Sequence, residues 1–216
     1  MATPDPETVK VLLASSNSGK LREYRELADG SVLTVAPLPN FGEVPPFSEC
    51  APTFAENAAG KALYYSRLAS DIVFADDSGL VVAALSGAPG VHSARYAGPK
   101  GTAQDCVQKL LGQMEGKEGS ERRARFVCVI AVARQGSLLA VVSDFVEGIL
   151  ANEPRGTEGF GYDPVFCFPD GSRTFAEIPP QEKNDYSHRG KAFRKVEEFL
   201  KSLASSLGSA TSNSTV

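Results

Sequence analysis

Apolar and polar residues alternate along the chain in a pattern that predicts strands and helices in succession. The first two elements are a buried strand at Val9–Ser15 and a helix at Lys20–Ala28. The other predicted helices span residues 54–69, 102–114 and 191–203, and the other predicted strands are Ile72–Ala75, Leu80–Leu85, Arg123–Arg134 and Ser137–Ala151. Residues 36–52 contain five prolines and no periodicity, so we expect a loop there.

The two longest strand signals predict an antiparallel hairpin. Arg123–Arg134 and Ser137–Ala151 are joined by Gln135-Gly136, a pair typical of a tight turn. A long hairpin argues against a purely parallel sheet. We therefore expect an α/β fold in which a mixed sheet is flanked by helices.

The ends of the chain and its charge narrow the class of protein further. Residues 1–8 and 205–216 are small and polar, so we expect disordered tails around a single domain over residues 9–204. The formal net charge of −4 disfavours broad binding to nucleic acid. No apolar run approaches the roughly 20 residues that span a bilayer, and the four cysteines include no CxxC pair. We expect a cytoplasmic protein with reduced thiols and no membrane partner.

Small polar residues connect the first predicted strand to the first predicted helix. They are Ser15, Ser16, Asn17, Ser18 and Gly19, and Lys20 follows them. Backbone N–H groups at a helix start, together with the helix dipole and a lysine, favour a bound phosphate. The segment is not a P-loop, because Ala14 and Leu21 stand where that motif needs glycine and Ser or Thr. A helix cap with a solvent-exposed lysine explains the same residues equally well.

Two adjacent carboxylates, Asp76 and Asp77, follow a short apolar run and precede Ser78. Hard divalent cations such as Mg²⁺ take oxygen ligands, usually from one or two carboxylates, phosphates and water. Glu49, in the proline-rich loop, is a candidate for a further carboxylate ligand. An acidic turn is the alternative interpretation of the pair.

Asn57 and Lys61 lie four residues apart on a predicted helix and therefore share one face. Lys61 can point into a cleft towards an anionic substrate. The alternative is that this face of the helix is solvated.

A glycine-rich segment is the first candidate for nucleoside binding. Phe160 and Tyr162 offer flat rings on which a base can stack, and Gly161 lets the backbone approach a ligand closely. Asp163 offers polar contacts. A flexible surface loop is the alternative.

A basic segment near the C-terminus is the second candidate. It contains Lys183, His188 and Arg189, which can clamp a nucleotide. The guanidinium of Arg189 donates hydrogen bonds but cannot accept them, which favours a 6-oxo purine over adenine. A solvated helix start is the alternative.

Taken together, six motifs carry a resemblance to a known family. In chain order they are SSNSGK, TFAENAAGKA, FADDSGL, GAPGVHSARYAG, GFGYDPVF and EKNDYSHRGKA. Over residues 9–203 this order resembles the non-canonical purine nucleoside triphosphate pyrophosphatases, the inosine/xanthosine triphosphate pyrophosphatases of the Ham1/RdgB-like family. In one position the chain departs from the common pattern, since Ser16 replaces a glycine, and this puts substrate affinity in question.

The resemblance implies an elongated mixed α/β fold with two lobes around a central cleft, and a homodimer. It also implies Mg²⁺-dependent cleavage of ITP, dITP and XTP between the α- and β-phosphates, with Mn²⁺ as an alternative metal. The products are the nucleoside monophosphate and pyrophosphate. A nucleotide-binding sensor without turnover is the alternative function.

The resemblance also assigns roles to the candidate residues. Ser15–Lys20 and Lys61 are expected to hold the triphosphate, and Ser78 to touch the substrate. Asp77 is expected to be the catalytic acid or base and, with Glu49, a metal ligand. The nucleoside is expected to contact Phe160, Gly161, Tyr162, Asp163, Lys183, His188 and Arg189.

Overall fold

A six-stranded mixed sheet forms the centre of the molecule. The computed structural model describes residues 8–212, with side chains described up to residue 206. The strands are β1 Val9–Leu13, β2 Leu33–Pro37, β3 Ile72–Val82, β4 Arg123–Arg134, β5 Ser137–Leu150 and β6 Phe166–Cys167. The helices are α1 Ser18–Leu27, α2 Phe54–Ser66, α3 Ala103–Gln113, α4 Pro180–Tyr186 and α5 His188–Ser212. The strand order is β2-β1-β3-β4-β5-β6, with β1 parallel to β2 and β3 and the other neighbours antiparallel, so the predicted mixed sheet is confirmed.

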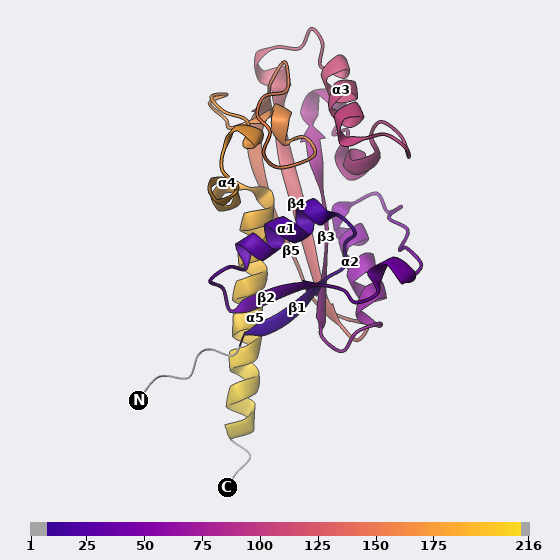
Figure 1. Ribbon diagram of the computed structural model, residues 1–216, viewed down its shortest axis with the longest axis vertical. Helices are drawn as coiled ribbons and strands as arrows, with labels where there is room; N and C mark the ends of the chain where they lie inside the picture. Colours follow the sequence, from indigo (N-terminus) through magenta and orange to yellow (C-terminus); the bar gives the residue numbers. More distant parts are fainter. Residues whose placement is uncertain (1–7, 213–216) are drawn as a thin grey trace.

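The molecule is elongated, and β3, β4 and β5 run along its length (Figure 1). One lobe contains β1, β2 and α2, and the other contains α3 and the segment between β5 and α4. Helices α2 and α5 lie on either side of the long strands, and α1 crosses the middle of the molecule (Figure 1). None of the helices within residues 8–212 is long and apolar enough to cross a membrane.

The strand that carries the two aspartates is continuous. β3 has eleven residues, whereas the sequence pattern predicts two shorter strands at Ile72–Ala75 and Leu80–Leu85. The predicted break is wrong because β3 continues to pair with β4 through Asp76 and Asp77, which lie opposite Ile130 and Val129. Successive side chains of a strand point to opposite faces, so the two aspartates face different sides of the sheet.

β2 and α5 also differ from the predictions, and β6 and α4 lie where no strand or helix is predicted. β2 lies at Leu33–Pro37, where no strand is predicted, and it overlaps the start of the predicted proline-rich loop. α5 is longer than the predicted helix at residues 191–203, and the backbone of residues 205–212 is helical rather than disordered. The helix continues because no proline interrupts it. Residues 1–7 and 213–216, the rest of the predicted tails, lie outside the described residues.

Three apolar clusters pack against the sheet and leave a polar junction between them. On one face, Tyr24 of α1, Phe74 of β3 and Phe193 of α5 pack together, and the ring centroids of Tyr24 and Phe74 are 5.0 Å apart. On the opposite face, α2 packs on the sheet through residues such as Ala58. The third cluster surrounds Phe126 in the other lobe. The polar residues of β3 begin two positions after Phe74, which places them where the lobes meet.

Candidate active site

A cavity of about 570 Å³ lies between the two lobes. Its walls come from the start of α1, the loop before α2, α2 itself, the middle of β3, the glycine-rich segment, α4 and the start of α5. All seventeen predicted site residues line it: Ser15, Ser16, Asn17, Ser18, Gly19, Lys20, Glu49, Lys61, Asp77, Ser78, Phe160, Gly161, Tyr162, Asp163, Lys183, His188 and Arg189. The cavity therefore unites motifs that are far apart in the sequence.

The first turn of α1 forms one wall of the cavity. Asn17 caps the helix, because its Oδ1 accepts a hydrogen bond from the backbone N–H of Lys20 at 3.1 Å. The ammonium of Lys20 is 2.9 Å from Oδ1 of Asp76, and its side chain is 14% exposed. The helix-cap interpretation is thus correct for Asn17, but the interpretation of Lys20 as a solvent-exposed lysine is wrong.

Asp76 is fully buried and holds the cationic groups around it. Besides Lys20, Nε of Arg189 lies 3.6 Å from Oδ2 of Asp76, and the hydroxyl of Ser78 donates to the same oxygen at 3.2 Å. Burial acts to raise the pKa of Asp76, but the positive charges of Lys20 and Arg189 outweigh it and lower the pKa to about 2. Asp76 is therefore ionised throughout the physiological range and serves as an anchor.

Asp77 lies on the other face of β3 and has a different character. Its side chain faces the cavity, and Nδ2 of Asn57 donates to its Oδ2 at 3.0 Å. Burial raises the pKa of Asp77 to about 6, although the hydrogen bond from Asn57 and the charge of Lys61 act in the opposite direction. A carboxyl group with a pKa close to the working pH is suited to moving a proton. The interpretation of the pair as an acidic turn is wrong because β3 runs through both residues without a break.

The polar face of α2 is buried rather than solvated. Asn57 is 1% exposed and also accepts a hydrogen bond from the backbone N–H of Ala51 at 3.0 Å. Lys61 donates to Oε1 of Glu49 at 2.9 Å, and both side chains line the cavity. Glu49 and Asp77 are consequently the two carboxylates placed on the cavity wall near Lys61.

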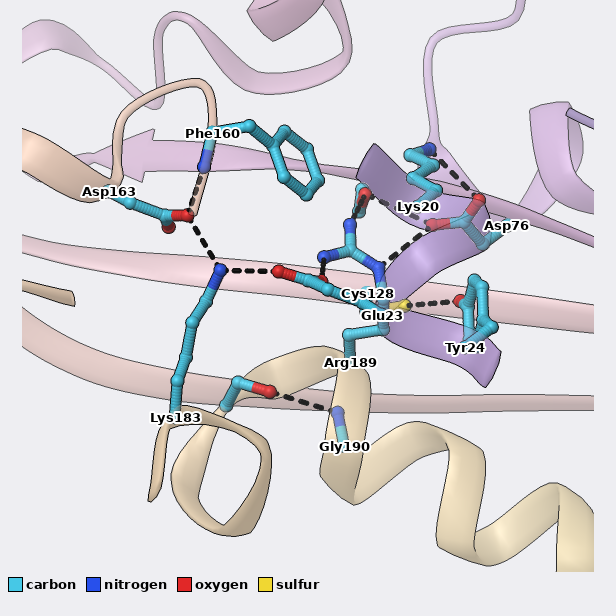
Figure 2. A network of polar contacts seen from close by, with 12 residues as sticks. Lys20, Glu23, Tyr24, Asp76, Cys128, Phe160, Asp163, Lys183, Arg189 and Gly190 are labelled. Atoms are coloured by element: carbon cyan, nitrogen blue, oxygen red, sulfur yellow. Dashed lines mark hydrogen bonds and ion pairs between the residues drawn. The ribbon is translucent and has the colours of Figure 1, made fainter. Parts of the chain in front are cut away.

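A buried ionic network forms the opposite end of the cavity (Figure 2). Glu23 of α1 accepts from Lys183 through Oε1 at 2.6 Å and from Arg189 through Oε2 at 2.5 Å. Lys183 also donates to Oδ2 of Asp163 at 2.6 Å. Sequence reasoning missed Glu23. The available signal is that this acidic residue precedes the apolar Tyr24 and follows Lys20 by three positions, which places it on the inward side of the helix.

The glycine-rich segment is fixed by contacts, so the interpretation as a flexible surface loop is wrong. The backbone N–H of Phe160 donates to Oδ2 of Asp163 at 2.7 Å, and the hydroxyl of Tyr162 donates to the backbone carbonyl of Ser93 at 2.9 Å. The ring of Phe160 lies 5.3 Å from both the ammonium of Lys183 and the guanidinium of Arg189. Tyr162 is buried in the wall, whereas Phe160 is half-buried and presents its ring to the cavity.

The helix start at His188 and Arg189 is also buried, and His188 is not a cation. Its imidazole stacks on Phe126, with ring centroids 4.7 Å apart and an angle of 12° between the planes. Burial, and then the charges of Arg189 and Lys183, lower the pKa of His188 well below its usual range. The prediction of a basic clamp is therefore wrong for His188. Its Nδ1 is buried and makes no hydrogen bond within the described residues.

The arrangement suits a ligand that carries phosphate at one end and a flat ring at the other. One end of the cavity offers a helix start with lysines, the middle offers a carboxyl group of raised pKa, and the other end offers a ring beside two buried cations. The model of the Ham1 family matches residues 11–199, and the chain belongs to this family.

Individual relatives agree with that assignment. The chain is 45% identical over 199 residues to a protein of Geobacillus kaustophilus named dITP/XTP pyrophosphatase, with 92% of this chain and 98% of that protein covered. It is 44% identical to a protein of Listeria innocua with the same name, covering 88% and 94%. Among solved structures, a HAM1 protein from Coxiella burnetii matches with a TM-score of 0.79 and 43% identity, covering 90% of this chain and 99% of that one.

Glu23 provides a direct test of the buried network. Glu23→Gln removes the charge that Lys183 and Arg189 share, so we expect the free energy of unfolding at pH 7 to fall by roughly 3–5 kcal/mol. Urea denaturation followed by circular dichroism measures this value. Glu26→Gln, on the same helix, is the matched control and should change it by less than about 0.5 kcal/mol. A loss below about 1 kcal/mol for Glu23→Gln would show that the network does not hold the fold together.

Proposed function

We propose that the chain hydrolyses the non-canonical purine nucleoside triphosphates ITP, dITP and XTP to the monophosphate and pyrophosphate. The names of its relatives support this substrate class. The structural observation that carries the proposal is the division between Asp76 and Asp77. Asp76 is an ionised anchor beneath the cavity, and Asp77 is the group within the cavity that accepts a proton.

Mg²⁺ is the cofactor that we propose, with Mn²⁺ as an alternative. The carboxylates of Asp77 and Glu49 line the same cavity, and the charge of Glu49 contributes to the raised pKa of Asp77. Within the described residues, no group of three or more His, Cys, Asp or Glu side chains is placed to hold an ion. Two carboxylates suit Mg²⁺, which takes its other ligands from substrate phosphates and water. When bound, the ion supplies positive charge to the phosphate oxygens during attack.

In the proposed reaction, Asp77 acts as the general base. Its carboxylate accepts a proton from a water molecule whose oxygen forms a bond to the α-phosphorus, and the bond from that phosphorus to the α,β-bridging oxygen breaks. The hydrogen bond from Asn57 fixes the orientation of the carboxylate. Lys20 and Lys61 line the phosphate end and stabilise the pyrophosphate as it leaves.

Selection of the purine base of the substrate follows from the hydrogen-bond donors at the end of the cavity away from the phosphates. Lys183 and Arg189 carry N–H donors and no acceptors, and their carboxylate partners Glu23 and Asp163 are already occupied by these cations. A 6-oxo group meets donors there, whereas the 6-amino group of adenine would be left without an acceptor. An unpaired buried polar group costs a few kcal/mol, which corresponds to roughly a hundredfold in rate.

A panel of nucleotides tests the proposed function. With Mg²⁺, pyrophosphate release from ITP, dITP and XTP should exceed release from ATP by about a hundredfold in kcat/KM. EDTA should abolish the release. Equal values for ITP and ATP would contradict the selectivity. Binding of ITP without any pyrophosphate release would instead favour the nucleotide sensor.

Asp77→Asn separates catalysis from folding. Asparagine keeps the shape and can still accept from Asn57, but it cannot take a proton, so kcat should fall by about two orders of magnitude or more. A rate near that of the wild type would exclude Asp77 as the base. Steady-state kinetics with ITP measures this loss.

The same variant should be more stable than the wild type at neutral pH. The pKa of Asp77 is raised from 3.8 to about 6, so its ionised form costs the folded state on the order of 2 kcal/mol above pH 6. The gain of Asp77→Asn should shrink as the pH falls through 6 and vanish below about pH 3, where Asp77 is largely protonated in both the folded and the unfolded states. Denaturation of the metal-free proteins at pH 7.5 and pH 3 measures the two differences. Equal stability at pH 7.5 would contradict the raised pKa.

We also propose that the chain forms a homodimer through the exposed face of β5. Val141 and Phe145 lie four residues apart on this strand, share one face and are 43% and 48% exposed. β6 pairs only with Ile149 and Leu150, so within the described residues the rest of β5 has no outer strand beside it. Exposed apolar patches of this kind are typical of subunit interfaces.

Phe145→Glu tests the proposed dimer, because a charge on this face should prevent its burial. In sedimentation experiments at micromolar concentration, the wild type should be a dimer and the variant a monomer. Tyr186→Glu is the control, since Tyr186 is comparably exposed on α4 and should leave the dimer intact. A monomeric wild type would contradict the proposal.

A further inference from the structure

The cations that line the cavity differ in whether a carboxylate already neutralises them. Lys20 is paired with Asp76, Lys61 with Glu49, Lys183 with Glu23 and Asp163, and Arg189 with Glu23. Arg22 and Arg95 also line the cavity, and neither has a carboxylate partner within the described residues. These two arginines therefore carry the positive charge that is not already neutralised inside the protein.

Arg95 is fixed at the phosphate end of the cavity. It ends the short 3₁₀ helix Gly90–Arg95, and its Nη2 donates to the backbone carbonyl of Glu49 at 2.8 Å. The side chain of the same Glu49 accepts from Lys61. The guanidinium thus lies beside the Glu49–Lys61 pair. No comparable contact with another described residue fixes the side chain of Arg22.

The backbone that carries Arg95 is locked to the strand that carries Asp77. The hydroxyl of Ser93 accepts from the backbone N–H of Leu80 at 2.9 Å and donates to the carbonyl of Gly90 at 2.6 Å. A Cβ atom on Gly79 would lie only 2.4 Å from Oγ of Ser93, so a glycine is what allows this close packing. The position of Arg95 relative to Asp77 is therefore well defined.

We propose that Arg95 binds the β- and γ-phosphates of the substrate, and hence the pyrophosphate product. This inference rests on the proposed function and adds to it a residue that the motif comparison does not assign. A guanidinium has five N–H donors, and the contact with Glu49 uses only Nη2. The remaining donors match the geometry of two phosphate oxygens, and the side chain is exposed to the cavity rather than held by a counter-ion.

The hydrogen bond from Arg95 to the carbonyl of Glu49 also fits a purely structural role, in which Arg95 only holds the loop that carries Glu49. The two roles differ in what they do to the two products. A phosphate-binding Arg95 affects pyrophosphate and leaves the nucleoside monophosphate unaffected. A purely structural Arg95 affects both products together, or neither.

Calorimetric titration of pyrophosphate and of IMP in the presence of Mg²⁺ distinguishes the roles without any turnover. For Arg95→Gln, the Kd of pyrophosphate should rise roughly tenfold to a hundredfold, while the Kd of IMP stays within about twofold. Arg95→Lys keeps the charge and should lie between the wild type and Arg95→Gln. Lys100→Gln is the matched control, since it removes one exposed positive charge from the same segment outside the cavity.

Two results would overturn the inference. One is an unchanged pyrophosphate affinity in Arg95→Gln, and the other is an equal weakening for pyrophosphate and IMP. Failure of the proposed function is a separate result, because it would appear as absent pyrophosphate release from ITP by the wild type. In that case the titration still reports whether Arg95 binds pyrophosphate.

Discussion

The cavity depends on the carboxylate of Glu23. One oxygen binds Lys183 and the other binds Arg189, residues that lie 160 and 166 positions further along the chain. All three side chains are nearly inaccessible to solvent, so the charges are stable only as a set, because loss of one leaves another buried without compensation. The network thereby ties α1 to α4 and α5, and Asp76 extends it to β3 through its contact with Arg189. The fold and the ligand-binding wall are consequently held by the same interaction.

The alternation of side chains along β3 gives two neighbouring aspartates two environments. Asp76 faces the buried cations and is ionised, while Asp77 faces the cavity and Asn57, where burial raises its pKa to about 6. A turn would not separate the pair in this way, because both side chains would then share one solvated environment. The continuous strand thus lets one carboxylate organise positive charge while its neighbour, on the proposed function, accepts a proton.

Sequence reasoning identified residues whose chemistry is local and missed those whose meaning depends on distant partners. The segments around Lys20, Asp77 and Arg189 carry distinctive side chains in short motifs, and all of them reach the cavity. The polar stretch in β3 predicts a break in the strand. The strand continues because ion pairs and hydrogen bonds from other elements satisfy the side chains of Asp76 and Asp77. Glu23 is one acidic residue on a helix rich in charge, and nothing in its neighbourhood reveals that its partners lie in α4 and α5. Arg95 likewise acquires its position from a carbonyl 46 residues away.

Lys61 and Glu49 neutralise each other across 2.9 Å. A phosphate competes for the lysine and a cation competes for the carboxylate, so either one alone breaks the pair and leaves a charge without its partner. When a phosphate and a cation bind together, the Lys61–Glu49 pair is replaced by two new pairs, one between Lys61 and the phosphate and one between Glu49 and the cation. On the proposed function, metal and polyphosphate therefore bind cooperatively, and each raises the affinity for the other by the same factor. On the same proposal, the internal pair favours the metal–nucleotide complex over free nucleotide or free metal.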